Sequence, residues 1–212
     1  MTRVELWFDF ASTYSYPAVM RAEDEAAKRS LRVEWKPFLL GPIFRSAGWE
    51  SSPFNSQPAK AAYMWRDLAR LCAKHRLPFR RPGLFPQNSL GAARIATAAR
   101  EEHWLGGFVR SLMTAEFGRG RDIGDPAVVA ETLFDTIGDT AADWIARAAA
   151  DDVKQALRTR VERARELDIF GAPTFVVGDE LFWGQDRLED AFDWACGAHP
   201  VSSDDGEGGC GA

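Results

Sequence analysis

The sequence predicts an α/β fold in which a small sheet-forming unit is interrupted by a long helical segment. Apolar residues alternate at positions 4–10 and 31–38, on either side of a helical pattern. Helical periodicity dominates residues 60–167, and two short apolar runs and a last helix close the chain. The order is therefore strand, helix, strand, helical block, strand, strand, helix. One sheet with a helical insertion explains this order.

The N-terminal stretch predicts a strand–helix–strand unit. "VELWFDF" (4–10) alternates apolar and other side chains, and "LRVEWKPF" (31–38) does the same, so both are expected to be strands. The helix between them should span about 15–29. Because Pro17 is tolerated only in a first helical turn, Ser15 is the expected N-cap, and Ser12 is placed in the loop.

The middle of the chain reads as a loop followed by helices. Residues 41–58 are rich in Gly, Pro and Ser and show no periodicity, which predicts a loop. In the helices that follow, Asn88 and Asp125 are expected caps, the latter with Pro126 in the first turn. Gly171 is the expected stop of the last helix in this block.

The C-terminal stretch predicts a hairpin and a helix. Two apolar runs in 173–184 are joined by Gly178-Asp179, a two-residue turn signal. Asp186, with Glu189 three residues later, predicts a capping box for the final helix. Residues 201–212, "VSSDDGEGGCGA", are acidic and Gly-rich, and we expect them to be disordered.

Composition excludes several function classes. A net charge of -5 without a dense Lys/Arg block argues against nucleic acid and against an anionic membrane as partners. No apolar run is long enough to span a membrane, and residues 1–10 do not resemble a secretory leader. Three distant cysteines, Cys72, Cys196 and Cys210, predict neither a disulfide framework nor a zinc site. We therefore expect a cytoplasmic protein without a bound metal.

A cluster of hydroxyl groups in "FDFASTYSYP" (8–17) is the first candidate site. Ser12 stands where a strand should meet a helix, and the helix N-terminus favours an anion there. Helix capping explains any one of these hydroxyls equally well. A nucleophilic serine is disfavoured, because His75, His103 and His199 are all distant in sequence and no G-x-S-x-G elbow is present.

Three further features carry two readings each. Pro173 in "GAPT" heads a strand, and spacing alone does not show whether its peptide bond is cis. Asp186 is either a cap or, with Arg187, a charge pair that could reach the amino and carboxylate groups of a ligand. Lys60 at a helix start is either an ordinary surface lysine or a ligand contact.

Three segments together resemble one family. They are "FDFASTYSY", "PAKAAYMWRDLARLCAKHRLPFRRPGLFPQNSL" and "IFGAPTFVVGDELFWGQDRLED". In this order and spacing they resemble the 2-hydroxychromene-2-carboxylate isomerases, relatives of the kappa-class glutathione transferases within the DsbA-like group of thioredoxin folds. The likeness covers residues 3 to about 196. It implies a discontinuous thioredoxin-like domain (1–40 and 168–200) around a helical insertion domain (41–167).

The resemblance also implies glutathione as cofactor. Redox members of the group carry C-x-x-C where this chain has residues 12–15, so the thiol is expected to come from glutathione, and Ser12 matches the family's catalytic serine. Two departures from the family stand out: Thr13 replaces a frequent proline, and the loop before Lys60 is longer than in better-known members. The family's glutathione-contacting asparagine in this loop either corresponds to Asn55 or is missing where Glu50 stands. The implied glutathione contacts are Ser12, Thr13, Tyr14, Asn55, Lys60, Ala172, Pro173, Gln185, Asp186 and Arg187.

The function implied by the resemblance is a glutathione-dependent isomerase. Its substrate would be an aromatic-derived 2-oxo or 2-hydroxy acid, isomerised by thiolate addition, bond rotation and elimination. A kappa-like glutathione transferase or peroxidase would use the same cofactor site, and a catalytically silent thioredoxin-like binding module is the alternative outside enzymes. A homodimer is expected from the family.

Overall fold

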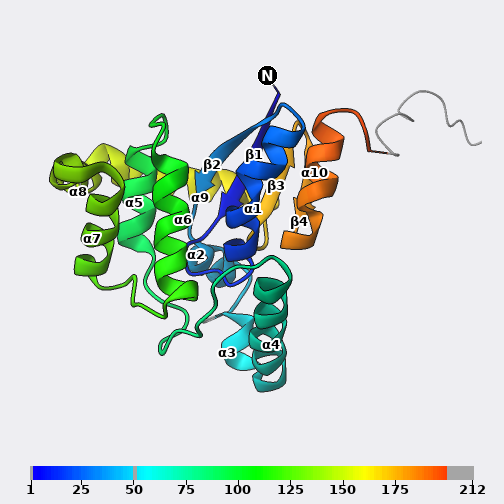
Figure 1. The fold of residues 1–212 in the computed structure, drawn as a ribbon, viewed down its shortest axis with the longest axis horizontal. Helices are drawn as coiled ribbons and strands as arrows, with labels where there is room; N and C mark the ends of the chain where they lie inside the picture. The colour runs from blue at the N-terminus through cyan, green and yellow to red at the C-terminus, as the bar shows by residue number, and fades with distance from the viewer. Residues whose placement is uncertain (1, 50–51, 200–212) are drawn as a thin grey trace, which may run out of the picture.

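A four-stranded mixed sheet forms the centre of the computed structural model, which describes residues 2–49 and 52–199 (Figure 1). Its strand order is β2-β1-β3-β4, with β1 parallel to β2 and the other neighbours antiparallel. This confirms the four predicted strands and the thioredoxin-like order of elements. The tail predicted to be disordered lies outside the described residues. The strands are β1 (Arg3–Phe8), β2 (Arg32–Pro37), β3 (Thr174–Val177) and β4 (Glu180–Trp183).

Helices cover both faces of the sheet. Alternate side chains of β1 point to opposite faces: Leu6 and Phe8 lie in one buried cluster with Val19 of α1, whereas Trp7 lies in a second cluster with Val161 of α9. Helices α1 (Ser15–Lys28) and α10 (Leu188–Ala195) pack on the first face, and α2 (Leu40–Ser46) and α9 (Asp151–Glu166) on the second.

The described residues between β2 and β3 contain helices and connecting segments, and no strand. None of the described helices is both long and apolar enough to cross a membrane. A π-helical turn, η1 (Thr114–Gly118), follows α6, and a 3₁₀ turn, η2 (Gly138–Thr140), follows α7. Besides α2 and α9, the helices are α3 (Pro53–Ser56), α4 (Pro58–Lys74), α5 (Leu90–Ala98), α6 (Leu105–Met113), α7 (Pro126–Ile137) and α8 (Ala141–Ala148).

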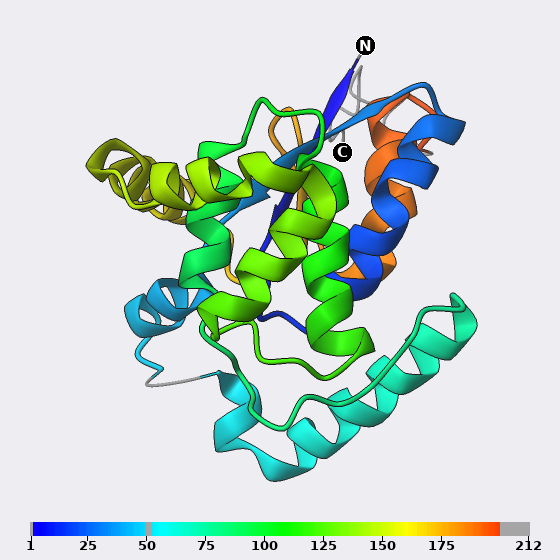
Figure 2. The same cartoon turned by 60° about the vertical axis from the view of Figure 1, so that its left-hand side comes forward.

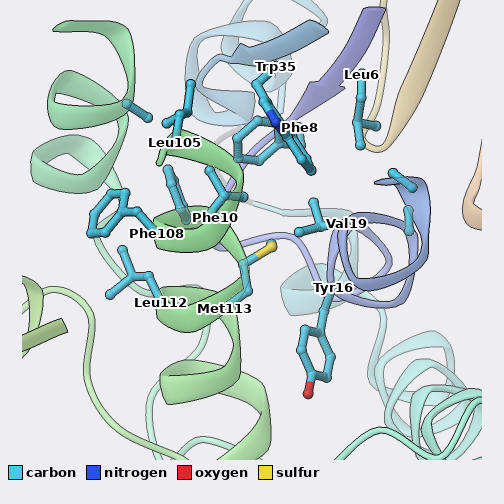
Figure 3. Close-up of a cluster of buried hydrophobic side chains, with 14 of the residues drawn as sticks. Leu6, Phe8, Phe10, Tyr16, Val19, Trp35, Leu105, Phe108, Leu112 and Met113 are labelled. Carbon is cyan, nitrogen blue, oxygen red and sulfur yellow. The ribbon is translucent and has the colours of Figure 1, made fainter. Parts of the chain in front are cut away.

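The helical segment shares its core with the sheet. Phe10, just after β1, packs edge-to-face against Phe108 of α6, with ring centroids 6.1 Å apart. Figure 3 shows Met113 of α6 on the side of Val19 and Tyr16 of α1, whereas Phe108 and Leu112 extend from the other side of the helix. All of them belong to one buried cluster. By contrast α4 runs along the lower edge of the molecule in Figure 2, on the side where α1 begins.

The start of α1 differs from the prediction. Ser15 is its first residue, not its cap, and the N-cap residue Tyr14 makes no side-chain capping bond. The hydroxyl of Ser12 accepts the hydrogen bond from the Ser15 amide instead, at 3.3 Å. The reason is a tight turn: the Ser15 amide also donates to the Ser12 carbonyl, which folds Ser12 back onto the first helical amides.

The predicted loop 41–58 is largely helical, because it contains α3 and all of α2 except its first residue. Ile43 of α2 is buried against the second face of the sheet. Ser52 caps α3 by accepting from the Phe54 amide, with Pro53 in the first turn. Helices this short show too little periodicity for a sequence pattern to detect them.

Two helix ends were also misplaced. α9 ends at Glu166, and Asp168, not Gly171, takes the left-handed backbone conformation (φ 55°) beyond it. Gly171 instead leaves room for Trp183, whose indole nitrogen would collide with any Cβ there. The capping box predicted for α10 is absent, since Asp186 pairs with Arg187 and Glu189 with Arg21. The predicted Asp125 cap is confirmed by its bond from the Ala127 amide, 2.9 Å.

Candidate functional site

Ser12 lies between the end of β1 and the start of α1 and joins two distant parts of the chain. Its side chain donates a hydrogen bond to the carbonyl of Ala172, at 3.0 Å, and accepts one from the Ser15 amide. The Ala172-Pro173 peptide bond, which spacing alone left open, is cis. Ser12 is 7% exposed, so its hydroxyl lies just beneath the surface at the positive end of the α1 dipole.

The buried carboxylate of Asp9 holds the loop that carries Ser12. It accepts hydrogen bonds from the Ala11 amide (3.0 Å), the Leu40 amide (2.8 Å) and the Ser89 hydroxyl (2.7 Å). Burial raises the pKa of Asp9, against the opposing effect of these bonds. The sequence analysis treated Asp9 as a polar position of a strand. Its place at the carboxyl end of that strand, directly before the hydroxyl cluster, was the signal that could have identified it as part of the site.

Tyr14 links the Ser12 loop to α4. Its hydroxyl donates to Asp67 Oδ2 at 3.1 Å, and its ring lies 6.4 Å from that of Phe54. Burial, followed by the negative charge of Asp67, raises the pKa of Tyr14, so this hydroxyl stays protonated. The sequence did not single out Asp67 or Phe54. Asp67 precedes the buried Leu68 on a helix, a position that borders the core face.

The segment Gln185–Arg187 forms a 3₁₀ turn, η3, that packs against α1. Asp186 and Arg187 are exposed and paired at 3.1 Å, and Arg187 also bonds Asp190 at 2.7 Å. The negative charge of Asp186 contributes to the raised pKa of Tyr14, which places the two groups within electrostatic reach. A cation and an anion are thus presented together beside the Ser12 loop.

The remaining predicted residues differ in accessibility. Lys60 is exposed on α4, with Nζ 5.8 Å from the centroid of the Phe54 ring. Thr13 is 2% exposed, so its side chain is buried. Asn55 belongs to α3, but its side chain lies outside the described part of the chain.

Two of the three cysteines lie in the described part of the chain. Cys72 is buried on α4, where burial raises the pKa of its thiol to about 11, and Cys196 is exposed at the end of α10. Cys210 is outside the described residues. Among residues 2–49 and 52–199, no group of three or more His, Cys, Asp and Glu side chains is arranged to hold a metal. The groups that the junction of β1 and α1 offers for chemistry are therefore the Ser12 hydroxyl and the N-terminus of α1.

Two cavities of ligand size lie in the described part of the structure. One of about 830 Å³ lies between the sheet and α9 and contains none of the predicted site residues. The other, of about 500 Å³, lies beside α4 and has Phe54 in its wall. The second cavity therefore adjoins the Ser12 loop through Tyr14 and Phe54.

Comparison with known proteins agrees with this arrangement. The family model described as a DSBA-like thioredoxin domain matches residues 3–193. A 2-hydroxychromene-2-carboxylate isomerase of Sphingobium xenophagum is 28% identical over 189 residues, which cover 88% of this chain and 94% of that protein.

Solved structures share the fold. A 2-hydroxychromene-2-carboxylate isomerase superposes with a TM-score of 0.82 at 23% identity, covering 92% of this chain and 97% of the other. The cytosolic disulfide reductase DsbM of Pseudomonas aeruginosa, solved with GSH, gives a TM-score of 0.61 at 15% identity, covering 91% and 95%.

Proposed function

The chain belongs to the family of DSBA-like thioredoxin domains, and on that premise we propose that it is a glutathione-dependent isomerase of the 2-hydroxychromene-2-carboxylate type. One observation carries the proposal: a serine, Ser12, occupies the β1–α1 junction and bonds to the residue before the cis-proline. A protein with a hydroxyl there needs a thiol from elsewhere. The isomerases among its relatives supply the reaction class.

The described residues fit glutathione at both ends of the Ser12 loop. Glutathione carries an amino and a carboxylate group at its γ-glutamyl end and a second carboxylate at its glycyl end. Asp186 and Arg187 offer the opposite charges for the first end, and Lys60, which lies over the Phe54 ring, offers one for the second. In this proposal the sulfur of glutathione lies at Ser12, between its two charged ends.

Bound glutathione supplies the sulfur nucleophile for reversible addition to a conjugated double bond. The protein's part is to hold that sulfur and favour its ionised form. For this the Ser12 hydroxyl must turn from the Ala172 carbonyl, where its proton now points, toward the sulfur. The N-terminus of α1 adds the positive end of a helix dipole, which stabilises a thiolate. Ser12 is thus a thiolate stabiliser and not a nucleophile.

The first prediction concerns turnover of 2-hydroxychromene-2-carboxylate. We expect isomerisation that requires reduced glutathione and falls by about 10²-fold or more in kcat/KM in Ser12→Ala, because one hydrogen-bond donor to a developing anion is worth that much. Ser46→Ala is the matched control, since its hydroxyl bonds only the nearby Ile43 carbonyl. The measurement is the rate of absorbance change with and without glutathione.

Other results of this experiment would contradict the proposed mechanism or favour a different function. Isomerisation without any thiol, or full activity in Ser12→Ala, would contradict the mechanism. Glutathione binding with turnover of other electrophiles, and none of the chromene acid, would favour the kappa-like transferase or peroxidase. No glutathione binding would favour the silent binding module. Cytoplasmic location and a homodimer stay predictions.

A further inference from the structure

The cavity beside α4 has the size of a small-molecule site. It measures about 500 Å³ and lies between α4 and residues 81–85. Phe54, Trp65 and Phe85 present aromatic rings to it. The rings of Trp65 and Phe85 pack edge-to-face, with centroids 4.9 Å apart. Ligand pockets typically measure roughly 300–1,000 Å³, and aromatic walls favour a flat ring.

Arg81 places a positive charge next to the aromatic wall of the cavity. The guanidinium carbon of Arg81 lies 4.9 Å from the centroid of the Trp65 ring. Among the residues the structure describes, no carboxylate lies within ion-pair distance of Arg81. A guanidinium held over a ring keeps its planar fork of N–H donors, which matches a carboxylate. Arg81 therefore gives the cavity a preference for an anionic ligand.

The cavity is connected to the Ser12 loop at two points. Phe54 lines the cavity and also contacts Tyr14, two residues from Ser12. On the other side, the chain that leaves the cavity at Phe85 reaches Ser89, whose hydroxyl bonds Asp9 beneath the same loop. A molecule in the cavity would thus lie next to the proposed sulfur site.

We propose that this cavity binds planar aromatic carboxylates, with the ring held among Phe54, Trp65 and Phe85 and the carboxylate paired with Arg81. That this ligand is the substrate of the isomerase rests on the proposed function. Binding of the ligand in the cavity does not, because it needs no glutathione. Aromatic packing selects the ring, and the charge-assisted pair selects the acid over neutral analogues.

The test is calorimetric titration of the full chain, without glutathione, with 2-naphthoate and with the neutral 2-naphthamide. We expect wild type to bind 2-naphthoate about 10-fold or more tightly than the amide, because a hydrogen bond to a charged group contributes that much. Arg81→Gln should lower 2-naphthoate affinity to that of the amide. Arg80→Gln, at an exposed neighbour outside the cavity wall, should leave the preference intact.

A second variant tests the ring site. Phe85→Leu keeps an apolar side chain but removes the partner ring of Trp65, and should weaken both ligands by a similar factor. Equal affinity of wild type for acid and amide would overturn the proposal, and so would an unchanged preference in Arg81→Gln.

The two proposals fail separately. If 2-naphthoate binds through Arg81 but no glutathione-dependent isomerisation occurs, only the proposed function is wrong. If isomerisation depends on glutathione and Ser12 while Arg81→Gln leaves KM for the chromene acid unchanged, only the carboxylate site is wrong.

Discussion

Glu116 is a buried acid that no role proposed for the Ser12 site uses. Glu116 has no exposed surface, and neither of its carboxylate oxygens has a hydrogen-bond partner among the described residues. It lies in the π-helical turn after α6, a distortion that is frequent at functional sites. Burial, and then the negative charges of Asp9 and Asp122, raise the pKa of Glu116 well above its usual value. The folded protein therefore holds a proton there.

The pH dependence of stability should reveal that proton. An unfolded glutamate ionises near about pH 4.3, so above this pH the unfolded chain releases a proton that the folded chain keeps, and stability falls as pH rises toward the folded pKa. Glu116→Gln removes this loss. Its stability relative to wild type should therefore increase from pH 5 to pH 8, by up to about 1.4 kcal/mol per pH unit. Urea midpoints at the two pH values measure it.

Glu131→Gln is the control with the opposite sign. Glu131 is exposed and bonded to Arg121, which lowers the pKa of Glu131, so its loss should not stabilise the protein at higher pH. The same advantage for Glu116→Gln at both pH values would show that Glu116 is ionised in the folded protein and contradict the assignment.

At the scale of elements, Asp9 is where three segments meet. Its carboxylate accepts from the Ala11 amide after β1, from the Leu40 amide that begins α2, and from Ser89, the N-cap of α5. Asp9→Ala leaves these donors without an acceptor, and we expect it to lower the free energy of unfolding by about 3 kcal/mol. Denaturant titration measures the loss.

Ser89→Ala is the comparison for Asp9. It removes one of the three bonds and should cost about 1 kcal/mol. If Asp9→Ala costs no more than Ser89→Ala, the two backbone amides find other partners and Asp9 does not hold these elements together.

Long periodic elements were predictable from the sequence, and junctions were not. Alternation placed β1 and β2 to within two residues, because a strand between two packed faces must repeat every second residue. The cap of α1 was misassigned to Ser15, since nothing in the local pattern shows that the chain turns back at Ser12. Gly171 was interpreted as a helix stop, but a glycine is needed there because Trp183 on β4 leaves no room for a Cβ.

The same distinction holds for the candidate site. Ser12, Pro173 and the Asp186–Arg187 pair stand in recognisable motifs, and the structure brings Ser12 to the residue preceding Pro173. By contrast, Asp67 accepts a hydrogen bond from Tyr14, and Arg81 lies over the ring of Trp65. The two residues of each pair are distant in sequence, so only the folded chain shows these contacts. Pattern reasoning had no means of pairing them.

At the scale of the whole molecule, the two predicted units do not have separate interiors. One buried cluster contains Phe8 and Phe10 from the N-terminal unit together with Phe108 and Leu112 from the helical one. Tyr16 of α1 also donates a hydrogen bond to the Pro78 carbonyl, at 2.8 Å. We therefore infer that 41–167, proposed as an insertion domain, folds and unfolds together with the sheet.

Hydrogen exchange of the folded protein tests this cooperativity. Phe108→Ala should open a cavity in the shared core and cost about 3–5 kcal/mol. If the core is one unit, the amides of β1 and those of α6 should lose the same protection, although the substitution lies on α6. Phe134→Ala, on an exposed ring of α7, should change neither. Loss of protection confined to the helical segment would mean that 41–167 opens alone, and the α/β unit would then hold the Ser12 loop without help from α6.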